Sequence, residues 1–525
     1  MRLLLLGAAL MLSSCANVAA PPAGADADTV AWWTITGELS GDDMEGRNTG
    51  SAGYDRAAKY VADRFAKAGL KPAGENGSWF QTLPLKEVRV EKDGTSFEVF
   101  SNLAESGRAR VEGDTVAIGL KVQLKFLHQI TVRPTTALPG SVSARLVFRG
   151  YCSADEMSDV AGKIVVCFGA RRAGMTTGGQ RLENAAKAGA VGIINVDDPG
   201  FTIEPLRWPE AYARAMSFKD APPPAYPEMA VMRLSAEALK IVISGSGRDA
   251  AAILKAGAAS QALPSFDIPS GLNASFMISQ REIQSDNVLA MLPGTDPKLA
   301  PEVVLVSAHL DGYGYGEPVN GDALYNGAFD DAAYVATMIR LAEQRAGKGF
   351  RRSVLFAVYT GEEKGLLGSN WYASHLTVPK EDLAAVINLD QLRPLFPLNI
   401  LTMHAIDDTT LAGNVRKVAA GMGIEIRRDM EPERNLNQRT DHFPFLRMGV
   451  PATNFVFGFD PKTEAERRYR EWYEVRYHRP QDDMSQPVDW GAARDMNLFF
   501  YRLTEDVAQA DERPRFAAGS QWAPK

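Results

Sequence analysis

Apolar runs that lead into acidic residues or histidines recur through the second half of the chain. Residues 303–306 form a run rich in β-branched side chains, and similar runs begin at Ser353, Leu383 and Pro451. Such short, continuous runs are typical of strands buried on both faces of a parallel sheet. Residues 335–342 instead repeat apolar positions at helical spacing. The alternation predicts an α/β domain whose mainly parallel sheet is covered on both faces.

A second, smaller pattern of strands and helices lies in the middle of the chain. Apolar runs predict strands at residues 144–148, 163–168, 191–196 and 229–232, with a helix at residues 180–189. With its proline-rich linker, this pattern is typical of a self-contained α/β module inserted into another domain. We expect a signal and flexible tether (1–29), the larger domain in two parts (30–120 and 266–510) around the insertion (121–265), and a tail (511–525).

Composition supports a folded, multidomain protein. The 525 residues are 45% hydrophobic, 23% charged and 9% aromatic, which is the balance of a globular chain of about two to four domains. The net charge is −7, and no basic cluster or zinc-finger spacing points to nucleic acid. No period of about 20–50 residues recurs, which excludes a repeat protein.

The N-terminal segment resembles a bacterial lipoprotein signal. Arg2 precedes an apolar run that is too short to span a bilayer, and the run ends in Leu-Ser-Ser-Cys at residues 12–15. This ending resembles a lipobox, which implies cleavage before Cys15 and lipid on its sulfur. Ala16 then favours the outer membrane, with the protein facing the periplasm. The alternative is an ordinary cleaved signal peptide.

Lipidation of Cys15 would leave Cys152 and Cys167 in an oxidising compartment. A disulfide between these two residues and a pair of buried free thiols both remain open, because sequence does not give the distance between them.

Residues that follow the predicted strands form a candidate metal-binding set of two imidazoles and three carboxylates: His309, Asp330, Glu363, Asp390 and His478. These nitrogen and oxygen donors suit zinc, and also cobalt or manganese. Five ligands exceed what one tetrahedral catalytic zinc uses, whereas one carboxylate that bridges two ions accounts for all five. Glu362 is then free to act as a base.

Six motifs in order carry a resemblance to a known family: SAHLD, NGAFDD, GEEKGLLGS, INLDQ, RTDHFPF and YHRPQDD. They resemble the motifs of the bimetallic zinc exopeptidases of metallopeptidase family twenty-eight, which includes bacterial aminopeptidases and glutamate carboxypeptidases. Residues 144–247 are similar to the protease-associated domain that many members carry as an insertion. The resemblance implies a three-layer α/β/α zinc-exopeptidase domain with a mainly parallel central sheet, interrupted by this smaller domain, and two zinc ions.

Each candidate ligand receives a role from the resemblance. His309 and Asp390 would hold one metal, Glu363 and His478 would hold the other, and Asp330 would bridge them. The family pattern selects Asp330 over the adjacent acidic residue. Near it the sequence departs from the family in having larger or less polar residues, namely Phe329, Ala333 and Tyr334. The departure leaves the local packing and the pocket shape open.

Further residues are candidates for supporting roles. Asp311 would orient His309, and Asp482 would orient His478. Three candidates for the substrate pocket are His442, Arg171 and Arg172, because paired arginines suit a substrate carboxylate. A structural histidine and a solvated loop are the alternatives for these three. His375 and His404 have no motif context and are expected on the surface.

The function that follows from the resemblance is zinc-dependent peptide hydrolysis, with Glu362 taking a proton from a metal-bridged water and passing it to the leaving amine. We expect an aminopeptidase that acts on peptide substrates. A carboxypeptidase or dipeptidase built on Arg171 and Arg172 is the alternative within the same class. A binding protein on an inactive peptidase fold is the alternative from another class, although such proteins typically lose ligands that this chain retains. The preferred side chain and the oligomeric state stay open.

Overall fold

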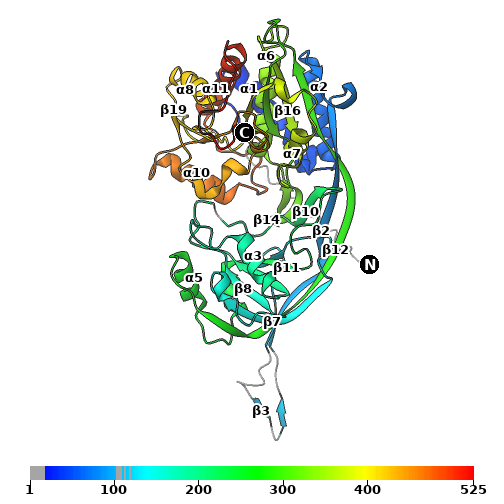
Figure 1. Ribbon diagram of the computed structural model, residues 1–525, viewed down its shortest axis with the longest axis vertical. Coiled ribbons are helices and arrows are strands. Elements are labelled where there is room, and N and C mark those ends of the chain that lie inside the picture. The colour runs from blue at the N-terminus through cyan, green and yellow to red at the C-terminus, as the bar shows by residue number, and fades with distance from the viewer. Residues whose placement is uncertain (1–17, 102–108, 112–113, 117–119, 205, 525) are drawn as a thin grey trace, which may run out of the picture.

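The computed structural model describes residues 18–101, 109–111, 114–116, 120–204 and 206–524. Within them the chain forms two lobes joined along one side by two long antiparallel strands, β2 (Phe80–Ser101) and β12 (Ser265–Leu292) (Figure 1). Their register runs from Phe80 opposite Val288 to Ser101 opposite Ser270. These strands carry the chain out of the first lobe and back into it.

The first lobe has a mainly parallel sheet in the order β20 (Ala452–Thr453), β17 (Leu383–Asn388), β13 (Val303–His309), β16 (Ser353–Tyr359) and β12. β13 pairs in parallel with both β16 and β17, while β12 is antiparallel to β16. Every residue of β13, β16 and β17 is buried, as the continuous apolar runs predict.

Helices cover both faces of this sheet. Alternate side chains of β13 enter two different cores, with Val304 and Val306 on one face and Val303 and Leu305 on the other. The first face packs against α1 (Ala27–Leu39), α2 (Ala52–Lys67), α6 (Ala333–Gln344), α8 (Leu411–Ala420) and α11 (Trp490–Gln509). The second packs against α7 (Leu367–Ser374) and α9 (Phe443–Arg447). The three-layer α/β/α architecture predicted from sequence is therefore present.

The single strand expected at residues 451–457 is wrong. The structure divides it into β20 in the main sheet and β21 (Phe455–Phe457), which pairs with β18 (Ile400–Met403) beside β19 (Glu425–Arg427). The division falls at Asn454, whose carbonyl accepts a hydrogen bond from the His404 amide at 2.9 Å. The chain changes its pairing partner there, from β17 to β18.

The second lobe is the inserted module. Its part of the sheet runs β7 (Ser141–Arg149), β8 (Ile164–Phe168), β9 (Gly192–Val196), β11 (Ala230–Leu234) and β6 (Ile130–Val132), with helices α3 (Gly178–Lys187), α4 (Leu239–Val242) and α5 (Ala250–Ala258). β7, β8, β9 and β11 are parallel. β10 (Ala213–Phe218) then returns to pair with β2.

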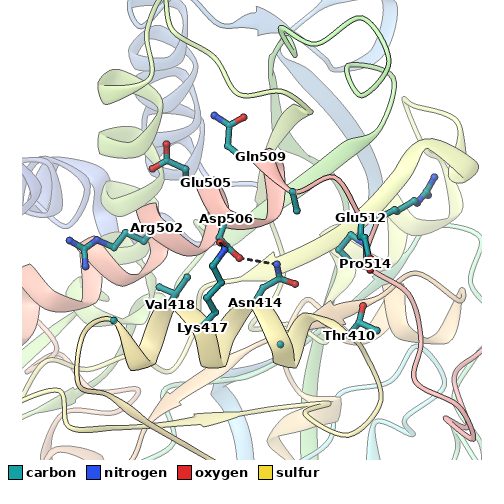
Figure 2. Close-up of a pocket in the computed structure, with 14 residues that line it drawn as sticks. Thr410, Asn414, Lys417, Val418, Arg502, Glu505, Asp506, Gln509, Glu512 and Pro514 are labelled. Atoms are coloured by element: carbon teal, nitrogen blue, oxygen red, sulfur yellow. Dashed lines mark hydrogen bonds and ion pairs between the residues drawn. The ribbon is translucent and has the colours of Figure 1, made fainter.

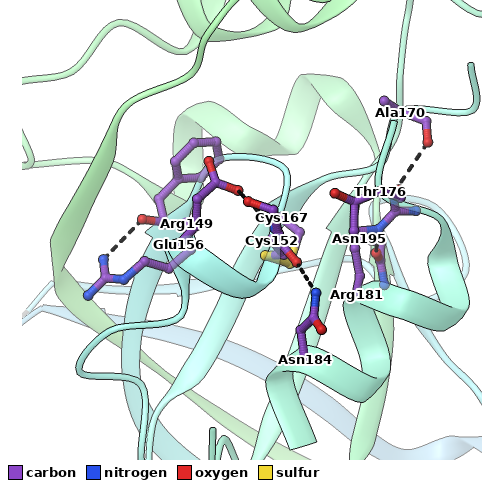
Figure 3. Close-up of a disulfide and its surroundings, with 11 residues drawn as sticks. Arg149, Cys152, Glu156, Cys167, Ala170, Thr176, Arg181, Asn184 and Asn195 are labelled. Atoms are coloured by element: carbon purple, nitrogen blue, oxygen red, sulfur yellow. Dashed lines mark hydrogen bonds between the residues drawn. A yellow bond between two sulfur atoms is a disulfide. The ribbon is translucent and has the colours of Figure 1, made fainter. Parts of the chain in front are cut away.

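A disulfide joins Cys152, just after β7, to Cys167 in β8 (Figure 3). The two Cα atoms are 5.6 Å apart, and both residues lie in a buried cluster of this lobe. Asn184 of α3 donates to the Cys152 carbonyl at 3.0 Å. Of the two alternatives left by the sequence, the structure therefore contains the disulfide.

The expectation of a flexible tether up to residue 29 is wrong at its C-terminal end. α1 begins at Ala27 and is capped by Asp26, whose carboxylate accepts from the Thr29 amide. Ala19 is held before it, since its carbonyl accepts from the Trp33 indole at 2.7 Å and its amide donates to Met484. Cys15 lies outside the described residues. Within the part of the chain that the structure describes, no helix is long and apolar enough to cross a membrane.

Candidate metal centre and active site

The ends of three neighbouring parallel strands deliver most of the predicted site. His309 is the last residue of β13, Asp390 follows β17 by two residues, and Glu362 and Glu363 follow β16. The carboxyl ends of adjacent parallel strands meet at one edge of a sheet, where ligands of open α/β folds bind. The strand-to-loop order read from the sequence therefore places these side chains together.

Asp330 reaches the site from a turn at Ala328–Ala332, immediately before α6. Gly327 starts this turn with φ +64°, and a Cβ there would lie 2.4 Å from the Asp330 carbonyl oxygen, so only glycine fits. Asp482 holds the same turn, because its carboxylate accepts from the Phe329 amide at 2.9 Å and its carbonyl accepts from Ala328. His478 comes from the loop after α10 (Glu464–Val475).

The candidate ligands form two groups that share Asp330. In each group the ligand atoms all lie within 4.8 Å of one another; the groups are His309, Asp330, Asp331 and Asp390, and Asp330, Glu363 and His478. His309 Nε2 is 3.3 Å from Asp330 Oδ1, whereas His478 Nε2 is 3.3 Å from Asp330 Oδ2. The two carboxylate oxygens of Asp330 therefore face different imidazoles, which is the arrangement of a bridging ligand.

Asp331 lies in the first group but is anchored differently. Its Oδ2 accepts a hydrogen bond from the His309 amide at 2.9 Å, which fixes it against the end of β13. Only Asp330 belongs to both groups. The geometry thus favours Asp330 as the shared residue.

The site concentrates buried negative charge that suits a cation. Burial, opposed by His309, raises the pKa of Asp390 to about 6, and its Oδ2 has no hydrogen-bond partner among the described residues. Burial also raises the pKa of Asp331 well above its ordinary value. For Asp330 burial acts in the same direction, but hydrogen bonds from His309 and His478 hold its pKa well below the ordinary range. Since buried carboxylates are costly unless paired or metal-bound, these donors fit divalent ions such as zinc.

Glu362 lies beside the ligands without belonging to either group. Its Oε2 is 3.9 Å from His309 Nε2, and its amide donates to Asp311 Oδ1 at 2.9 Å. Burial, together with the nearby charges of Asp390 and Glu363, raises the pKa of Glu362 well above its ordinary value. A carboxyl with a raised pKa at the edge of a cavity has the properties of a general base that later acts as an acid.

A cavity of about 340 Å³ opens onto this cluster. Besides Asp330, Glu362, Glu363 and His478, its wall consists of Arg207, Tyr313, Gly365, Leu366, Gln391, Leu436, Gln438, Arg439 and Tyr477. Arg207 comes from the inserted lobe, between β9 and β10. The inserted lobe therefore forms part of the candidate active site.

The two carboxylates that were predicted to orient the histidines have different outcomes in the structure. Asp311 does lie against His309, although its backbone carbonyl, 3.1 Å from Nδ1, is closer than its carboxylate at 3.7 Å. The prediction for Asp482 is wrong, because its carboxylate is turned towards the Asp330 turn. Nδ1 of His478 instead meets the Tyr313 hydroxyl at 2.6 Å.

The prediction of His442 in the substrate pocket is also wrong. The ring is fully buried outside the cavity, with its two nitrogens hydrogen-bonded to Thr440 and Asn437 at 2.7 and 3.0 Å. The alternative of a structural histidine therefore holds. His404 was expected on the surface, but it is buried as well; it directly follows β18, and its amide donates to the Asn454 carbonyl. His375 is exposed, as expected.

Arg171 and Arg172 do not line the metal-site cavity. Arg171 pairs with Glu204 at 3.0 Å, and Arg172 pairs with Asp198 at 2.8 Å and donates to the Gly257 carbonyl. These contacts hold both guanidinium groups within the inserted lobe and at its junction. The carboxylate-binding role predicted for the pair is therefore not supported by their positions.

Among the residues of the site that had no assignment from sequence are Arg207, Tyr313 and Arg393. Tyr313 follows Asp311 by two residues in the loop after β13, so its position in that loop was a usable signal. Arg393 is fully buried with its guanidinium 3.5 Å from Asp330 Oδ2. Arg207 lies in a loop without periodicity, and only the fold brings it to the metal site.

A separate hollow of about 610 Å³ lies between α8 and α11 (Figure 2). Asp506 of α11 accepts hydrogen bonds there from Asn414 and Lys417 of α8, so these charges are paired across the hollow. It contains none of the predicted site residues. Its size alone does not make it a candidate for catalysis.

Comparison with protein-family models finds two matches. Residues 287–504 match peptidase family M28, and residues 142–239 match the PA domain. The first range contains the predicted ligands and Glu362, and the second contains most of the sheet of the inserted lobe. Both matches agree with the motifs and the domain order read from the sequence.

Individual relatives share part of the chain. Leupeptin-inactivating enzyme 1 of Streptomyces exfoliatus is 25% identical over 225 residues, covering 41% of this chain and 47% of that enzyme. Aminopeptidase YwaD of Bacillus subtilis is 26% identical over 190 residues, covering 35% and 36%. The matched segments therefore span less than half of the length of these two curated relatives.

Solved structures share the fold over almost the whole chain. An aminopeptidase from Aneurinibacillus sp. strain AM-1 has a TM-score of 0.60 at 18% identity, covering 92% of this chain and 95% of that one. The zinc aminopeptidase BSAP from Bacillus subtilis has a TM-score of 0.55 at 16% identity, covering 94% and 97%. At these identities the similarity establishes a common fold.

Proposed function

We propose that this chain, which belongs to peptidase family M28 and carries an inserted PA domain, is a dinuclear zinc exopeptidase that removes N-terminal residues from peptides. One observation carries the proposal. Asp330 lies between two ligand groups, with an imidazole 3.3 Å from each of its oxygens, while Glu362 lies next to the cavity and outside both groups. The aminopeptidases among the relatives and solved structures support the choice of the N-terminal end.

His309, Asp330 and Asp390 would hold one ion, and Asp330, Glu363 and His478 the other. Zinc bound there would act as a Lewis acid, lowering the pKa of water and polarising a carbonyl. Glu362 would take a proton from the attacking water on its carboxylate and transfer it to the nitrogen of the leaving amine. Asp311 fixes the positions of Glu362 and His309 relative to each other, because it forms hydrogen bonds with both residues.

The experiment is product analysis on Leu-Ala-Phe and two blocked forms. We expect leucine to be released first from the free peptide and from its C-terminal amide, and no release after N-acetylation, since the acetyl group removes the charge and donors of the amine. Mass spectrometry identifies the products. Release of phenylalanine from the acetylated peptide would replace the aminopeptidase assignment by a carboxypeptidase.

We further propose that the protein faces the periplasm as a lipoprotein anchored through Cys15, on the basis of the Leu-Ser-Ser-Cys ending. Cys15→Ser would then abolish labelling by radioactive palmitate and shift the protein from membrane to soluble fractions. Unchanged labelling of that variant would overturn the anchor without affecting the catalytic proposal.

A further inference from the structure

The metal-site cavity has a positively charged wall. Once the candidate ligands and Glu362 are set aside, the charged residues that line it among the described residues are Arg207 and Arg439. Apart from the candidate ligands and Glu362, no carboxylate lines this cavity among the described residues. The remaining electrostatic preference of the cavity is therefore for an anionic group.

The buried carboxylate of Glu204 forms ion pairs with three arginines near this wall. Glu204 is 2% exposed and accepts from Arg439 at 2.9 and 3.1 Å, from Arg171 at 3.0 Å and, more weakly, from Arg207 at 3.4 Å. Three guanidinium groups around one carboxylate leave an excess of positive charge. Arg439 and Arg171 hold the shorter contacts, so Arg207 is the least compensated of the three.

The other polar contact of Arg207 does not satisfy it. Arg207 approaches Nδ1 of His478, a ring nitrogen with at most one lone pair, and the Tyr313 hydroxyl already lies 2.6 Å from the same atom. A guanidinium has five N–H donors. Arg207 lies over the Tyr477 ring at 5.0 Å, which supports its plane and leaves its edge for hydrogen bonding.

Arg207 also forms part of the walls of two cavities. With Tyr313 it lines both the metal-site cavity and a second cavity of about 560 Å³, whose other lining residues belong to the inserted lobe. In the second cavity Arg214 is 9% exposed; its Nε forms an ion pair with Glu87 Oε1 at 3.2 Å, and its Nη1 has no hydrogen-bond partner among the described residues. Arg207 and Tyr313 are thus shared by the walls of the two cavities, and the second cavity is lined by carboxylates as well as by arginines, namely Asp197, Asp198, Glu204 and Glu210.

We propose that Arg207, supported by Arg439, binds a carboxylate of the peptide substrate in the metal-site cavity. The inference rests on the proposed peptidase function and adds a substrate class to it, namely peptides with a negative charge close to the cleaved bond. An arginine can form two parallel hydrogen bonds with a carboxylate, which gives position as well as attraction. The carboxylate is supplied either by the C-terminus of a dipeptide or by an acidic side chain.

Matched substrate pairs distinguish these two sources. Leu-Ala against Leu-Ala-amide varies only the C-terminal charge, and Glu-Ala-amide against Gln-Ala-amide and Leu-Glu-amide against Leu-Gln-amide vary only a side-chain charge. We expect the wild-type enzyme to prefer the charged member of at least one pair by about 10- to 100-fold in kcat/KM, as for hydrogen bonds to a charged group. The pair that discriminates identifies the source.

Arg207→Gln should bring the kcat/KM ratio of the charged to the neutral substrate close to one. Arg207→Lys should retain part of this preference, because an ammonium keeps the charge but cannot form two parallel hydrogen bonds. Arg171→Gln is the matched control. It removes the same charge from the same carboxylate, Glu204, but Arg171 does not line the metal-site cavity, so the ratio should persist. A wild-type enzyme without discrimination in any pair, or an Arg207→Gln enzyme that keeps it, would overturn the inference.

Calorimetry on chelator-treated protein separates this inference from the proposed function. Metal-free wild-type protein should bind the charged member of the discriminating pair more tightly than its neutral partner, and Arg207→Gln should lose the difference. Hydrolysis of the neutral amides without such discrimination would reject the carboxylate subsite and leave the peptidase intact. Binding discrimination without any hydrolysis would support the subsite and reject the peptidase.

Discussion

Removing the Arg47 side chain should destabilise the larger lobe, because this residue ties several loops of the site together. Its buried guanidinium donates to the carbonyls of Leu310 and Asn326 at 2.7 and 2.6 Å. It also donates to the carbonyls of Leu39 and Gly327, each at 2.8 Å. One side chain from the segment after α1 thus holds the chain next to His309 and the turn that precedes Asp330.

The expected magnitude for Arg47→Met follows from these four contacts. A buried acceptor that loses its donor costs about 1–3 kcal/mol, so four of them give a lower estimate of about 4 kcal/mol. Unfolding entropy is about 2.1 cal/mol/K per residue, which for 525 residues corresponds to about 1.1 kcal/mol/K. The melting temperature should therefore fall by about 4 °C if the whole chain unfolds together, and by more if the larger lobe melts alone.

Differential scanning calorimetry of metal-free wild-type and variant protein measures this shift without any contribution from bound ions. Arg56→Met is the matched control, because Arg56 also donates to a carbonyl, that of Asp43, but its side chain is 45% exposed. Its loss should cost no more than about 0.5 kcal/mol. Equal melting temperatures for Arg47→Met and Arg56→Met would refute the reasoning that the buried contacts stabilise the lobe.

Three further predictions concern the active site, the lobe junction and the inserted lobe. Glu362→Gln should keep its zinc and lose about 10²–10⁴-fold or more in kcat. Glu363→Gln should lose activity and also lose metal, as measured by elemental analysis. Identical behaviour of the two variants would show that the assignments of Glu362 as base and Glu363 as ligand are wrong. Burial would raise the pKa of Glu204, but Arg439, Arg207 and Arg171 hold it well below its ordinary value, so the stability advantage of wild type over Glu204→Gln should be full above about pH 5 and shrink as the pH falls below about 4 in denaturant titrations. Reduction of Cys152–Cys167, which closes a separation of 15 residues, should cost the inserted lobe about 3 kcal/mol, and an unchanged unfolding midpoint in reductant would contradict this.

The sequence predicted the strands that a continuous apolar run specifies, and it predicted the functional residues that follow them. The apolar runs at β13, β16 and β17 gave the buried parallel strands, and the residues after them gave His309 and Asp390. The lengths of β2 and β12 were not predicted from sequence, because both strands run between the lobes and their pairing partners lie far away in the chain.

The errors at the site arose because partners were assigned from motif spacing or from charge alone. Asp482 lies four residues after His478 in the sequence, but the loop turns its carboxylate towards the Phe329 amide. Arg171 was suggested by its charge, yet Arg207 is the arginine of the inserted lobe that borders the metal site. The Asp482 contact depends on how loops pack within the larger lobe, and the position of Arg207 depends on how the two lobes pack. No periodicity in the chain encodes either arrangement.

Titration of zinc into chelator-treated enzyme tests the central claim most directly. Leucine release from Leu-Ala-Phe is followed while bound zinc per chain is measured by elemental analysis. Because Asp330 is shared by both ligand groups, activity should reach its plateau at two zinc ions per chain, and Asp330→Ala should bind at most one and remain inactive. Full activity with fewer than two ions, or an Asp330→Ala protein that still binds two, would contradict a bridged dinuclear site.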